Sequence, residues 1–316
     1  MTKVISIDHG NRNIKTLNHV FSSGYVESSI LPSIGGDILQ FNNKEYTIVD
    51  QCMPQQIDKT IDDRYFILTL FAIGKELAND MRLLRMFASD ELVHVELLIG
   101  LPLQHFKSLK EKYVHYFTNR DALTFTLNKR SYTVKITSAY VYPQAYAASV
   151  AAYSQLRGSK VVNVIDIGGY TVDCLQLTDN RPNMELCTSL YWGVNNLFRT
   201  INDHMRAGAG RDIPENIIES ILMNDPAILS ESSESRINLI RSCADTHASR
   251  LLSEVSQKGF DLVENKTVFV GGGSILLKQH ILNTRLVMKP IFVDNIRANA
   301  EGYNLIYTTS RQARIS

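Results

Sequence analysis

The sequence contains few of the residues that build metal centres and disulfide frameworks. Four cysteines stand among 316 residues, at Cys52, Cys174, Cys187 and Cys243, and no two of them form a C-x-x-C pair. The eight histidines are scattered along the chain. Structural zinc sites need clustered cysteine or histidine ligands, so this spacing argues against one. The sparse thiols suit a reducing cytoplasm.

An excess of charge and a long apolar run are also missing. The 33 basic and 32 acidic residues leave a net charge of +1, which argues against a large nucleic-acid surface. We therefore expect no direct DNA binding. The start MTKVISIDHG holds no apolar segment of signal-peptide length, and no eighteen consecutive apolar residues occur anywhere. The sequence predicts a cytoplasmic protein without membrane contact.

What the sequence does contain is an internal repeat. VISIDHGNRNIKTL and NVIDIGGYTVDCLQL both show an apolar strand, an Asp-x-Gly turn and a second strand. The repeat aligns Asp8 with Asp166 at an offset of 158 residues, half the chain length. A repeat of this length predicts two similar domains.

Hydrophobic periodicity outlines the elements around the two turns. It predicts helices over 65–80 and 81–89, a buried strand over 93–102, and a hairpin that turns at Asn128 and Lys129. Beyond the second turn, after residue 177, helices are expected to dominate until the strand at 265–272.

The two turns have the chemistry of a phosphate site. Glycine lets the backbone approach a ligand closely, and successive N–H groups of a turn favour phosphate oxygens. Asp8 and Asp166 could hold Mg²⁺ through water, and Lys15 could add a point charge for the phosphates. Each turn alone could also be an ordinary hairpin, but that reading gives no reason for a repeat at half-chain spacing.

A third glycine cluster follows the strand at 265–272. VFVGGGSILL carries Gly271, Gly272 and Gly273 between a strand and a helix. It matches neither the Walker A pattern nor G-x-G-x-x-G. Its glycines could let a purine and ribose lie against the backbone at a helix N-terminus, or they could serve close packing alone.

Five segments in this order resemble the actin-like ATPase superfamily: DHGNRNIK, YPQAYAA, IDIGGYTVD, VFVGGGSIL and AEGYNLI. The D-x-G-x-x-N-I-K form of the first is most similar to the ParM/StbA plasmid-segregation actins. The resemblance implies a duplicated, ribonuclease H-like α/β fold with two domains around a nucleotide cleft. Domain I would span 1–157, with a helix at 299–316 returning to it, and domain II would span 158–298.

The family also implies a function. Its members bind ATP and Mg²⁺, assemble head-to-tail into filaments and hydrolyse ATP, and a ParR-like adaptor on centromere-like plasmid DNA captures the filament. This chain is therefore expected to be an ATPase whose filaments segregate plasmid DNA. GTP stays open as an alternative nucleotide.

Carried over residue by residue, the resemblance assigns roles to the motif positions. Asp8 and Asp166 would face the metal, Gln144 would orient the attacking water, and Gly193 would lie near the nucleotide. Gln144 could instead be an ordinary residue of a first helical turn. The phosphate contacts would come from Gly10, Asn11, Asn13, Lys15, Gly168, Gly169, Tyr170 and Thr171, and the adenosine contacts from Gly271, Gly272 and Gly273.

Two positions carry a weaker assignment. Asp173 aligns with Lys15 in the repeat and would lie near the site or cap the turn. His9 is expected to be an incidental loop side chain.

Two rival functions fit the same fold. A small-molecule kinase of the superfamily needs an acid that deprotonates a substrate hydroxyl, and the carboxamide of Gln144 disfavours that role. A cytoskeletal scaffold could bind nucleotide with little hydrolysis. Phosphate release with and without a panel of sugars separates the kinase from the ATPase.

Overall fold

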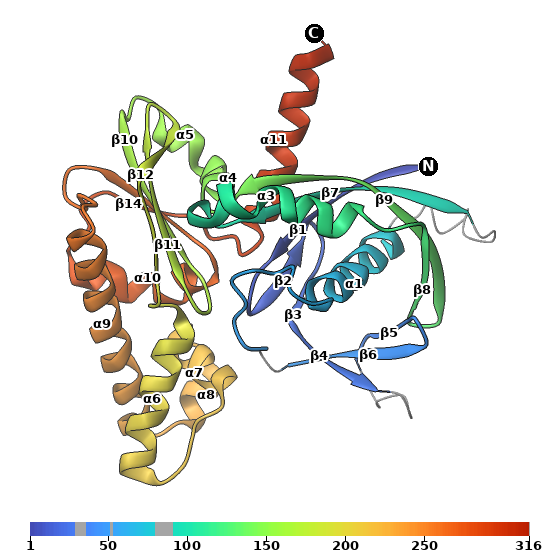
Figure 1. Cartoon of the computed structure of the whole chain (residues 1–316). Coiled ribbons are helices and arrows are strands. Elements are labelled where there is room, and N and C mark those ends of the chain that lie inside the picture. The colour runs from blue at the N-terminus through green and yellow to red at the C-terminus, as the bar shows by residue number, and fades with distance from the viewer. Residues whose placement is uncertain (29–35, 51–52, 80–90, 316) are drawn as a thin grey trace. The chain divides into compact units, whose positions relative to one another are not determined.

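Two compact units make up the chain. The computed structural model describes residues 1–28, 36–50, 53–79 and 91–315 (Figure 1). Unit 1 comprises Met1–Ala148 with Asn299–Ser316, and unit 2 comprises Ser149–Ala298. The helix predicted over 81–89 lies outside the described residues.

Unit 1 is built on a mixed sheet. Within the described ranges the sheet has nine strands in the order β3-β2-β1-β7-β9-β8-β5-β6-β4. The strands are β1 (Thr2–His9), β2 (Asn13–Thr16), β3 (Val20–Ser22), β4 (Gly24–Ser28), β5 (Ile38–Phe41), β6 (Lys44–Val49), β7 (Leu92–Leu101), β8 (Leu123–Leu127) and β9 (Arg130–Pro143). The sheet curves around α1 (Arg64–Ala78) (Figure 1).

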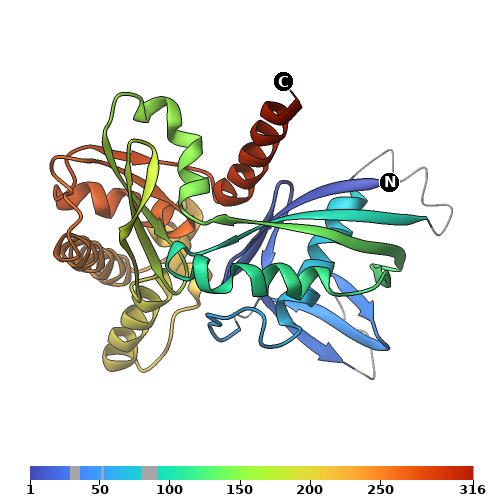
Figure 2. The same ribbon diagram turned by 45° about the horizontal axis from the view of Figure 1, so that its top comes forward.

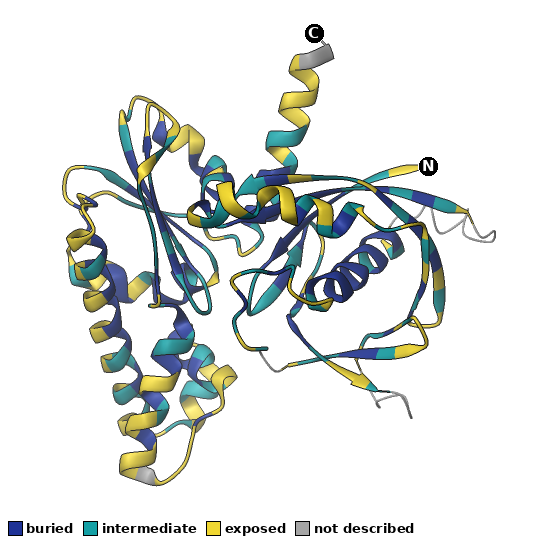
Figure 3. Ribbon diagram, viewed as in Figure 1, coloured by how far each residue is buried: buried dark blue, intermediate teal, exposed yellow. Residues whose placement is uncertain are grey.

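The helices of unit 1 follow the distribution of their apolar residues. α1 is apolar on nearly all sides and is buried along most of its length (Figure 3), as expected for a helix inside a core. α3 (Leu103–Thr118) buries one side only, through Leu103, Tyr113 and Phe117. α11 (Ala298–Ile315) packs Tyr303 against Leu98 of β7 and Ala147.

Unit 2 contains a second, smaller sheet with helices packed on it. Its described strands run in the order β12-β11-β10-β13-β14. They are β10 (Val161–Ile167), β11 (Val172–Thr178), β12 (Arg181–Leu190), β13 (Lys266–Val270) and β14 (Pro290–Phe292). α4 (Tyr146–Ser149) joins the two units in sequence. The helices of unit 2 are η1 (Val150–Ala152), α5 (Tyr153–Leu156), α6 (Val194–Ala209), α7 (Glu215–Leu222), α8 (Pro226–Glu231), α9 (Glu234–Gln257) and α10 (Gly272–Thr284). α9 packs against both α6 and α10 (Figure 2).

The helices expected after the second turn are present as α6, α7 and α9, but β12, which follows β11, had no counterpart among the expected elements. β12 extends the sheet through an antiparallel pairing with β11 that is interrupted by a bulge between Leu175 and Gln176. A bulge offsets the alternation of side chains along the pair, which blurs the strand pattern in the sequence.

The two sheets repeat one topology, as the internal sequence repeat predicts. In unit 1, β1, β2 and β3 form an antiparallel meander. On its other side β1 pairs in parallel with β7, and β7 pairs in parallel with β9. In unit 2, β10, β11 and β12 form the same meander. On its other side β10 pairs in parallel with β13, and β13 pairs in parallel with β14. The repeated Asp-x-Gly turns are therefore the first hairpins of two equivalent sheets.

Among the residues that the structure describes, no helix combines the length and the apolar character needed to cross a membrane.

Candidate functional site

The first turn brings three predicted residues together. Asp8 lies at the end of β1 in register with Lys15 of β2, and its side chain is buried. Lys15 Nζ lies 3.2 Å from Asp8 Oδ2, and Gln144 Nε2 donates a hydrogen bond of 2.8 Å to Asp8 Oδ1. Both carboxylate oxygens of Asp8 therefore contact a donor.

The backbone at the end of β9 holds Gln144 in this position. Gln144 N–H donates to the carbonyl of Leu101 at 2.8 Å, which extends the pairing of β7 and β9 by one residue. Ala145 then turns the chain with a φ of 62°, and its N–H donates to Asn299 Oδ1 at 3.0 Å. Gln144 precedes α4, which begins at Tyr146, so it lies in the link ahead of the helix and not in a first helical turn.

Gly10 and Asn11 shape the first turn. A Cβ atom on Gly10 would lie 2.5 Å from the carbonyl oxygen of Asn13, so the turn requires glycine. Asn11 Oδ1 accepts from the hydroxyl of Tyr65 at 2.8 Å and from the N–H of Gln56 at 3.4 Å. The Asn11 carboxamide thus anchors the turn to α1. The phosphate contacts of Gly10, Asn11 and Asn13 stay predictions.

His9 is not the incidental loop side chain that the sequence suggested. Its ring is fully buried, Nε2 lies 2.8 Å from Thr69 Oγ1, and Nδ1 lies 3.0 Å from the hydroxyl of Tyr113. The ring also stacks on Phe117. Burial lowers the pKa of His9 well below its usual value, and the charge of Lys59 adds to this. The signal was present in the sequence, because alternation along β1 puts His9 on the inward face with Ile5 and Ile7.

The second turn is tied to the beginning of α6. Gly168 N–H donates to the carbonyl of Thr171 at 2.9 Å and closes the hairpin. The carbonyls of Tyr170, Gly168 and Gly169 accept from the N–H groups of Gly193, Val194 and Asn195, at 3.2, 3.1 and 2.8 Å respectively. The predicted residues 168–171 and Gly193 therefore lie together.

The backbone of the second turn comes so close to residue 193 that this position must be glycine. A Cβ atom there would lie 2.4 Å from the carbonyl oxygen of Gly169, and any side chain would push the turn away from α6. The N–H groups at the start of α6 already have acceptors, so they are not available to an anion. The N–H groups of Gly169 and Thr171 have no acceptor in the described part of the chain, which fits the predicted phosphate contacts.

Asp173 lies beside Asp166 across the hairpin. The two acids are register partners on β10 and β11, at the positions that Asp8 and Lys15 occupy in unit 1. Ser189 donates a hydrogen bond to Asp173 Oδ1, and Thr171 donates to Oδ2 at 3.4 Å. Two like charges directly opposite each other repel. The metal-facing role of Asp166 stays a prediction. Groups of three or more metal-ligating side chains do not occur among the described residues.

The triple glycine lies at the carboxyl end of β13, next to Asp166. Gly271 has a φ of 86°, and a Cβ atom on it would lie 2.3 Å from Asp166 Oδ1. A Cβ atom on Gly273 would lie 2.4 Å from Ile167 Cγ2. Close packing accounts for these two glycines. At Gly272 the nearest atom would be 3.9 Å away, so only this position leaves open space for a ligand.

Comparison with known proteins tests the predicted family membership. A model of the N-terminal domain of actin-like proteins matches residues 6–146, and a model of the C-terminal domain of archaeal MreB-like actin homologues matches residues 164–283. Together these models cover both predicted phosphate turns. The chain is a member of the actin-like superfamily.

Solved structures agree with this assignment of the actin-like chain. The archaeal actin homolog Ta0583 superimposes with a TM-score of 0.78 at 18% identity, over 97% of this chain and 99% of that one, and its ADP complex with a TM-score of 0.75 at the same identity and coverage. A non-polymerisable quadruple mutant of pCBH ParM gives 0.70 at 18% identity, over 98% of this chain and 100% of that one. The Alp12 filament structure gives 0.64 at 17% identity, over 98% and 99%. The sequence has no significant match among curated proteins.

These likenesses confirm the predicted two-domain, actin-like α/β fold. At such low identity they establish the fold alone. The roles of individual residues in this actin-like chain rest on its own geometry.

Proposed function

We propose that this actin-like protein binds ATP with Mg²⁺, polymerises into filaments and hydrolyses the nucleotide. The observation that carries the proposal is the repeated hairpin, with Asp8 and Asp166 at equivalent strand ends and the Gln144 carboxamide on Asp8.

The donor set fits a magnesium-bound triphosphate. Lys15 and the N–H groups of Gly169 and Thr171 would contact phosphate oxygens. Asp8 and Asp166 would hold Mg²⁺ through its water ligands, which agrees with the lack of a dense carboxylate cluster in the described part of the chain. The metal would neutralise charge on the phosphates.

Gln144 is proposed to orient the water that attacks the γ-phosphate. A carboxamide suits this task, because little proton abstraction precedes the transition state of phosphoryl transfer. Its Nε2 group donates to Asp8 Oδ1, and the Oε1 atom would be the acceptor that orients the water.

The adenosine is proposed to lie over Gly272 at the start of α10. A side chain at this position would occupy the space that the nucleotide needs, whereas Gly271 and Gly273 are already explained by packing. Support for nucleotide binding comes from Ta0583, a fold relative whose complex with ADP has been solved.

Filament formation and plasmid segregation extend the proposal from the single chain to its assembly. Alp12 has been solved as a filament, and the ParM relative is described as a non-polymerisable mutant, which supports self-association for this fold. By the resemblance to ParM/StbA, a ParR-like adaptor on plasmid DNA would capture the filament.

Three measurements on the purified protein test the proposal. Phosphate release with ATP and Mg²⁺ should not depend on added sugars; release that requires a sugar would identify a kinase. Light scattering should rise on addition of ATP and Mg²⁺, and electron microscopy should image filaments. Polymer without phosphate release would identify the scaffold, and the same assays with GTP determine nucleotide preference.

A further inference from the structure

The chain makes a strained turn directly after Gln144. The carbonyl of Gln144 accepts from the N–H group of Tyr146 at 2.6 Å. Ala145 lies between them with a φ of 62°, a left-handed backbone that residues other than glycine rarely adopt. A bond between residues i+2 and i around a positive φ is typical of a strained γ-turn. Such strain persists only where the surrounding structure imposes it, so the turn requires support from another part of the fold.

The first turns of α11 supply that support. Asn299 is buried, and its Oδ1 accepts from the N–H group of Ala145 at 3.0 Å. A Cβ atom on Gly302 would lie 2.1 Å from the carbonyl oxygen of Ala147, so glycine lets the helix come directly against the backbone here. α11 therefore contacts the chain at the strained residue and again two residues beyond it.

Tyr303 lies behind the Gln144 side chain. A Cβ atom on Gly100 would lie 1.9 Å from the Tyr303 hydroxyl oxygen and 3.0 Å from Gln144 Cγ, so these two groups meet over the backbone of Gly100 at the end of β7. The Tyr303 ring is fully buried and stacks on Tyr142 of β9, with ring centroids 5.7 Å apart and 11° between the planes. Close packing fixes the ring, and its hydroxyl limits the space open to the Gln144 side chain.

α11 is also tied to the strand that carries Asp8. Ser6 Oγ donates a buried hydrogen bond to the carbonyl of Ala300. Ser6 and Asp8 are two residues apart on β1, so their side chains lie on the same face of the sheet. The same part of the helix therefore holds both partners of the hydrogen bond between Gln144 and Asp8.

We propose that Asn299 and Tyr303 are positioning residues for Gln144. Asn299 holds the turn that aims the carboxamide, and Tyr303 prevents the side chain from retreating, so that Oε1 stays where the attacking water would lie. The inference rests on the proposed role of Gln144 in orienting water and names the residues that support this role. Misplacement of a reacting group by about 1 Å can cost about 10²-fold in rate, so support of this kind would be visible in turnover.

A purely structural helix would make the same contacts. In that case the loss of one contact would lower the stability of the fold and leave the turnover of each folded chain unchanged. A positioning role predicts the opposite result, a lower kcat in chains that remain folded. Turnover and stability measured on the same variants therefore separate the two roles.

Removal of single groups tests both positions. Tyr303→Phe removes the hydroxyl and keeps the ring, and Asn299→Ala removes the acceptor for the Ala145 N–H group. Phosphate release with ATP and Mg²⁺, compared at equal light scattering, should show a kcat lowered about threefold in Tyr303→Phe and about tenfold in Asn299→Ala, with the KM for ATP changed less than about twofold. Wild-type kcat in a folded variant would exclude that residue, and Tyr303→Phe alone decides the test if Asn299→Ala does not fold.

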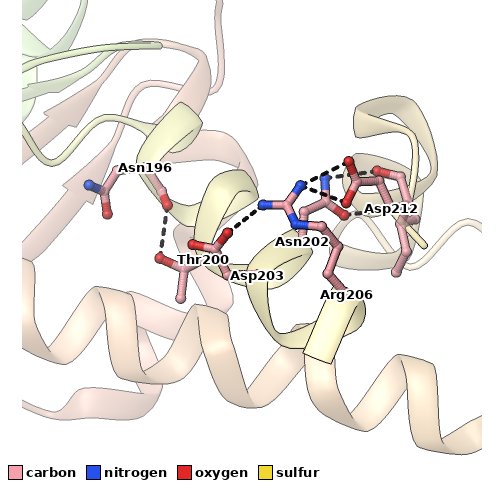
Figure 4. A network of polar contacts seen from close by, with 7 residues as sticks. Asn196, Thr200, Asn202, Asp203, Arg206 and Asp212 are labelled. Carbon is pink, nitrogen blue, oxygen red and sulfur yellow. Dashed lines mark hydrogen bonds and ion pairs between the residues drawn. The ribbon is translucent and has the colours of Figure 1, made fainter. Parts of the chain in front are cut away.

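Each variant has a matched control. Tyr307→Phe also removes a hydroxyl from α11, one turn further on, where it donates to Glu96. Asn202→Ala also removes a carboxamide that accepts from a backbone N–H group, that of Ile213 at 2.7 Å, in unit 2 (Figure 4). Both controls should keep the wild-type kcat even where thermal unfolding shows a loss of stability. An equal loss of kcat in the controls would mean that destabilisation explains the effect and would overturn the inference.

The Gln144→Ala background identifies the group through which these residues act. If Tyr303 acts through the carboxamide, Tyr303→Phe should slow the Gln144→Ala protein no further. Equal slowing in both backgrounds would contradict the inference and leave the proposed function intact. A Gln144→Ala protein that turns over at the wild-type rate, or wild type that releases no phosphate, would instead remove the proposed role of Gln144 together with this inference.

Discussion

Gln144 and Asp8 form a buried polar contact beside the first turn. Gln144 Nε2 donates to Asp8 Oδ1 at 2.8 Å, and Lys15 Nζ lies 3.2 Å from Asp8 Oδ2. The charge of Lys15 offsets that of the buried carboxylate, and the hydrogen bond fixes the direction of the Gln144 carboxamide, whose Oε1 atom would accept from the proposed attacking water.

Replacement of Gln144 separates hydrolysis from assembly. Gln144→Ala removes the group that orients water, so we expect phosphate release to slow by about 10²-fold while ATP-dependent light scattering persists. Gln40→Ala, at an exposed position of β5, is a control that should alter neither signal. Normal turnover in Gln144→Ala would exclude Gln144 from the mechanism.

His9 predicts a pH dependence of stability. Burial, followed by the charge of Lys59, lowers the pKa of His9 in the folded state below its unfolded value of about 6.5. The unfolded chain therefore binds a proton first as the pH falls, and the stability present above pH ~6.5 is lost below it, by at most about 1.4 kcal/mol per pH unit.

Urea unfolding at several pH values between 5 and 8 measures this effect. His247 also has a pKa lowered by burial, so His9→Gln should reduce the slope of stability against pH without removing it. His204→Gln, at an exposed position of α6, should keep the wild-type slope. An unchanged slope in His9→Gln would contradict the assignment.

At the scale of elements, α6 and the second turn behave as one structure. Three carbonyls of the turn accept from the first N–H groups of the helix, and Gly193 permits this because it has no Cβ atom. The helix thereby satisfies its own terminal donors and fixes the turn that is proposed to contact phosphate.

Two glycine substitutions close to and within α6 test this coupling. Gly193→Ala places a methyl group 2.4 Å from the carbonyl oxygen of Gly169, so we expect a loss of about 1–3 kcal/mol of stability and weaker ADP binding. Gly208→Ala, inside α6, meets no atom within 4 Å and should gain about 0.5–1 kcal/mol. Thermal unfolding measures the stability of each variant, and ADP titration measures its affinity for the nucleotide. Equal stability and equal affinity of the two variants would refute the coupling.

The elements also show which structural features can be predicted from sequence. The turn at Asn128 and Lys129 was predictable because it depends on local chemistry, and both residues adopt the positive φ of a tight hairpin, 49° and 68°. The repeat likewise predicted the equivalent positions of Asp8 and Asp166. The pattern concealed β12, since a bulge interrupts its pairing.

Tertiary contacts could not be predicted from the sequence. The requirement for Gly193 depends on Gly169, and the requirement for Gly271 depends on Asp166, each far away in the sequence. Sequence reasoning could propose these glycines for a nucleotide site but could not separate ligand contact from packing. The buried ring of His9 was available from strand alternation, yet its partners Thr69 and Tyr113 come from two helices that only the fold brings near.

At the scale of the whole molecule, the duplicated sheet assigns one acid to each unit. Unit 1 opposes Asp8 with Lys15, and unit 2 opposes Asp166 with Asp173. The duplication has thus diverged into one charge-balanced hairpin and one acidic hairpin. The proposed Mg²⁺-nucleotide carries both charges that these hairpins would complement, phosphate for Lys15 and a cation for the acids.

A double-mutant cycle tests whether both units serve one nucleotide. Calorimetric titration with ADP and Mg²⁺ should give one site per chain, and Asp8→Asn and Asp166→Asn should each weaken binding. If both acids act on the same metal ion, the double variant should lose less binding free energy than the two single losses combined, by about 0.5–3 kcal/mol. Asp121→Asn, at a fully exposed position, should bind like wild type. Strict additivity, or two sites per chain, would mean that the two hairpins bind independently.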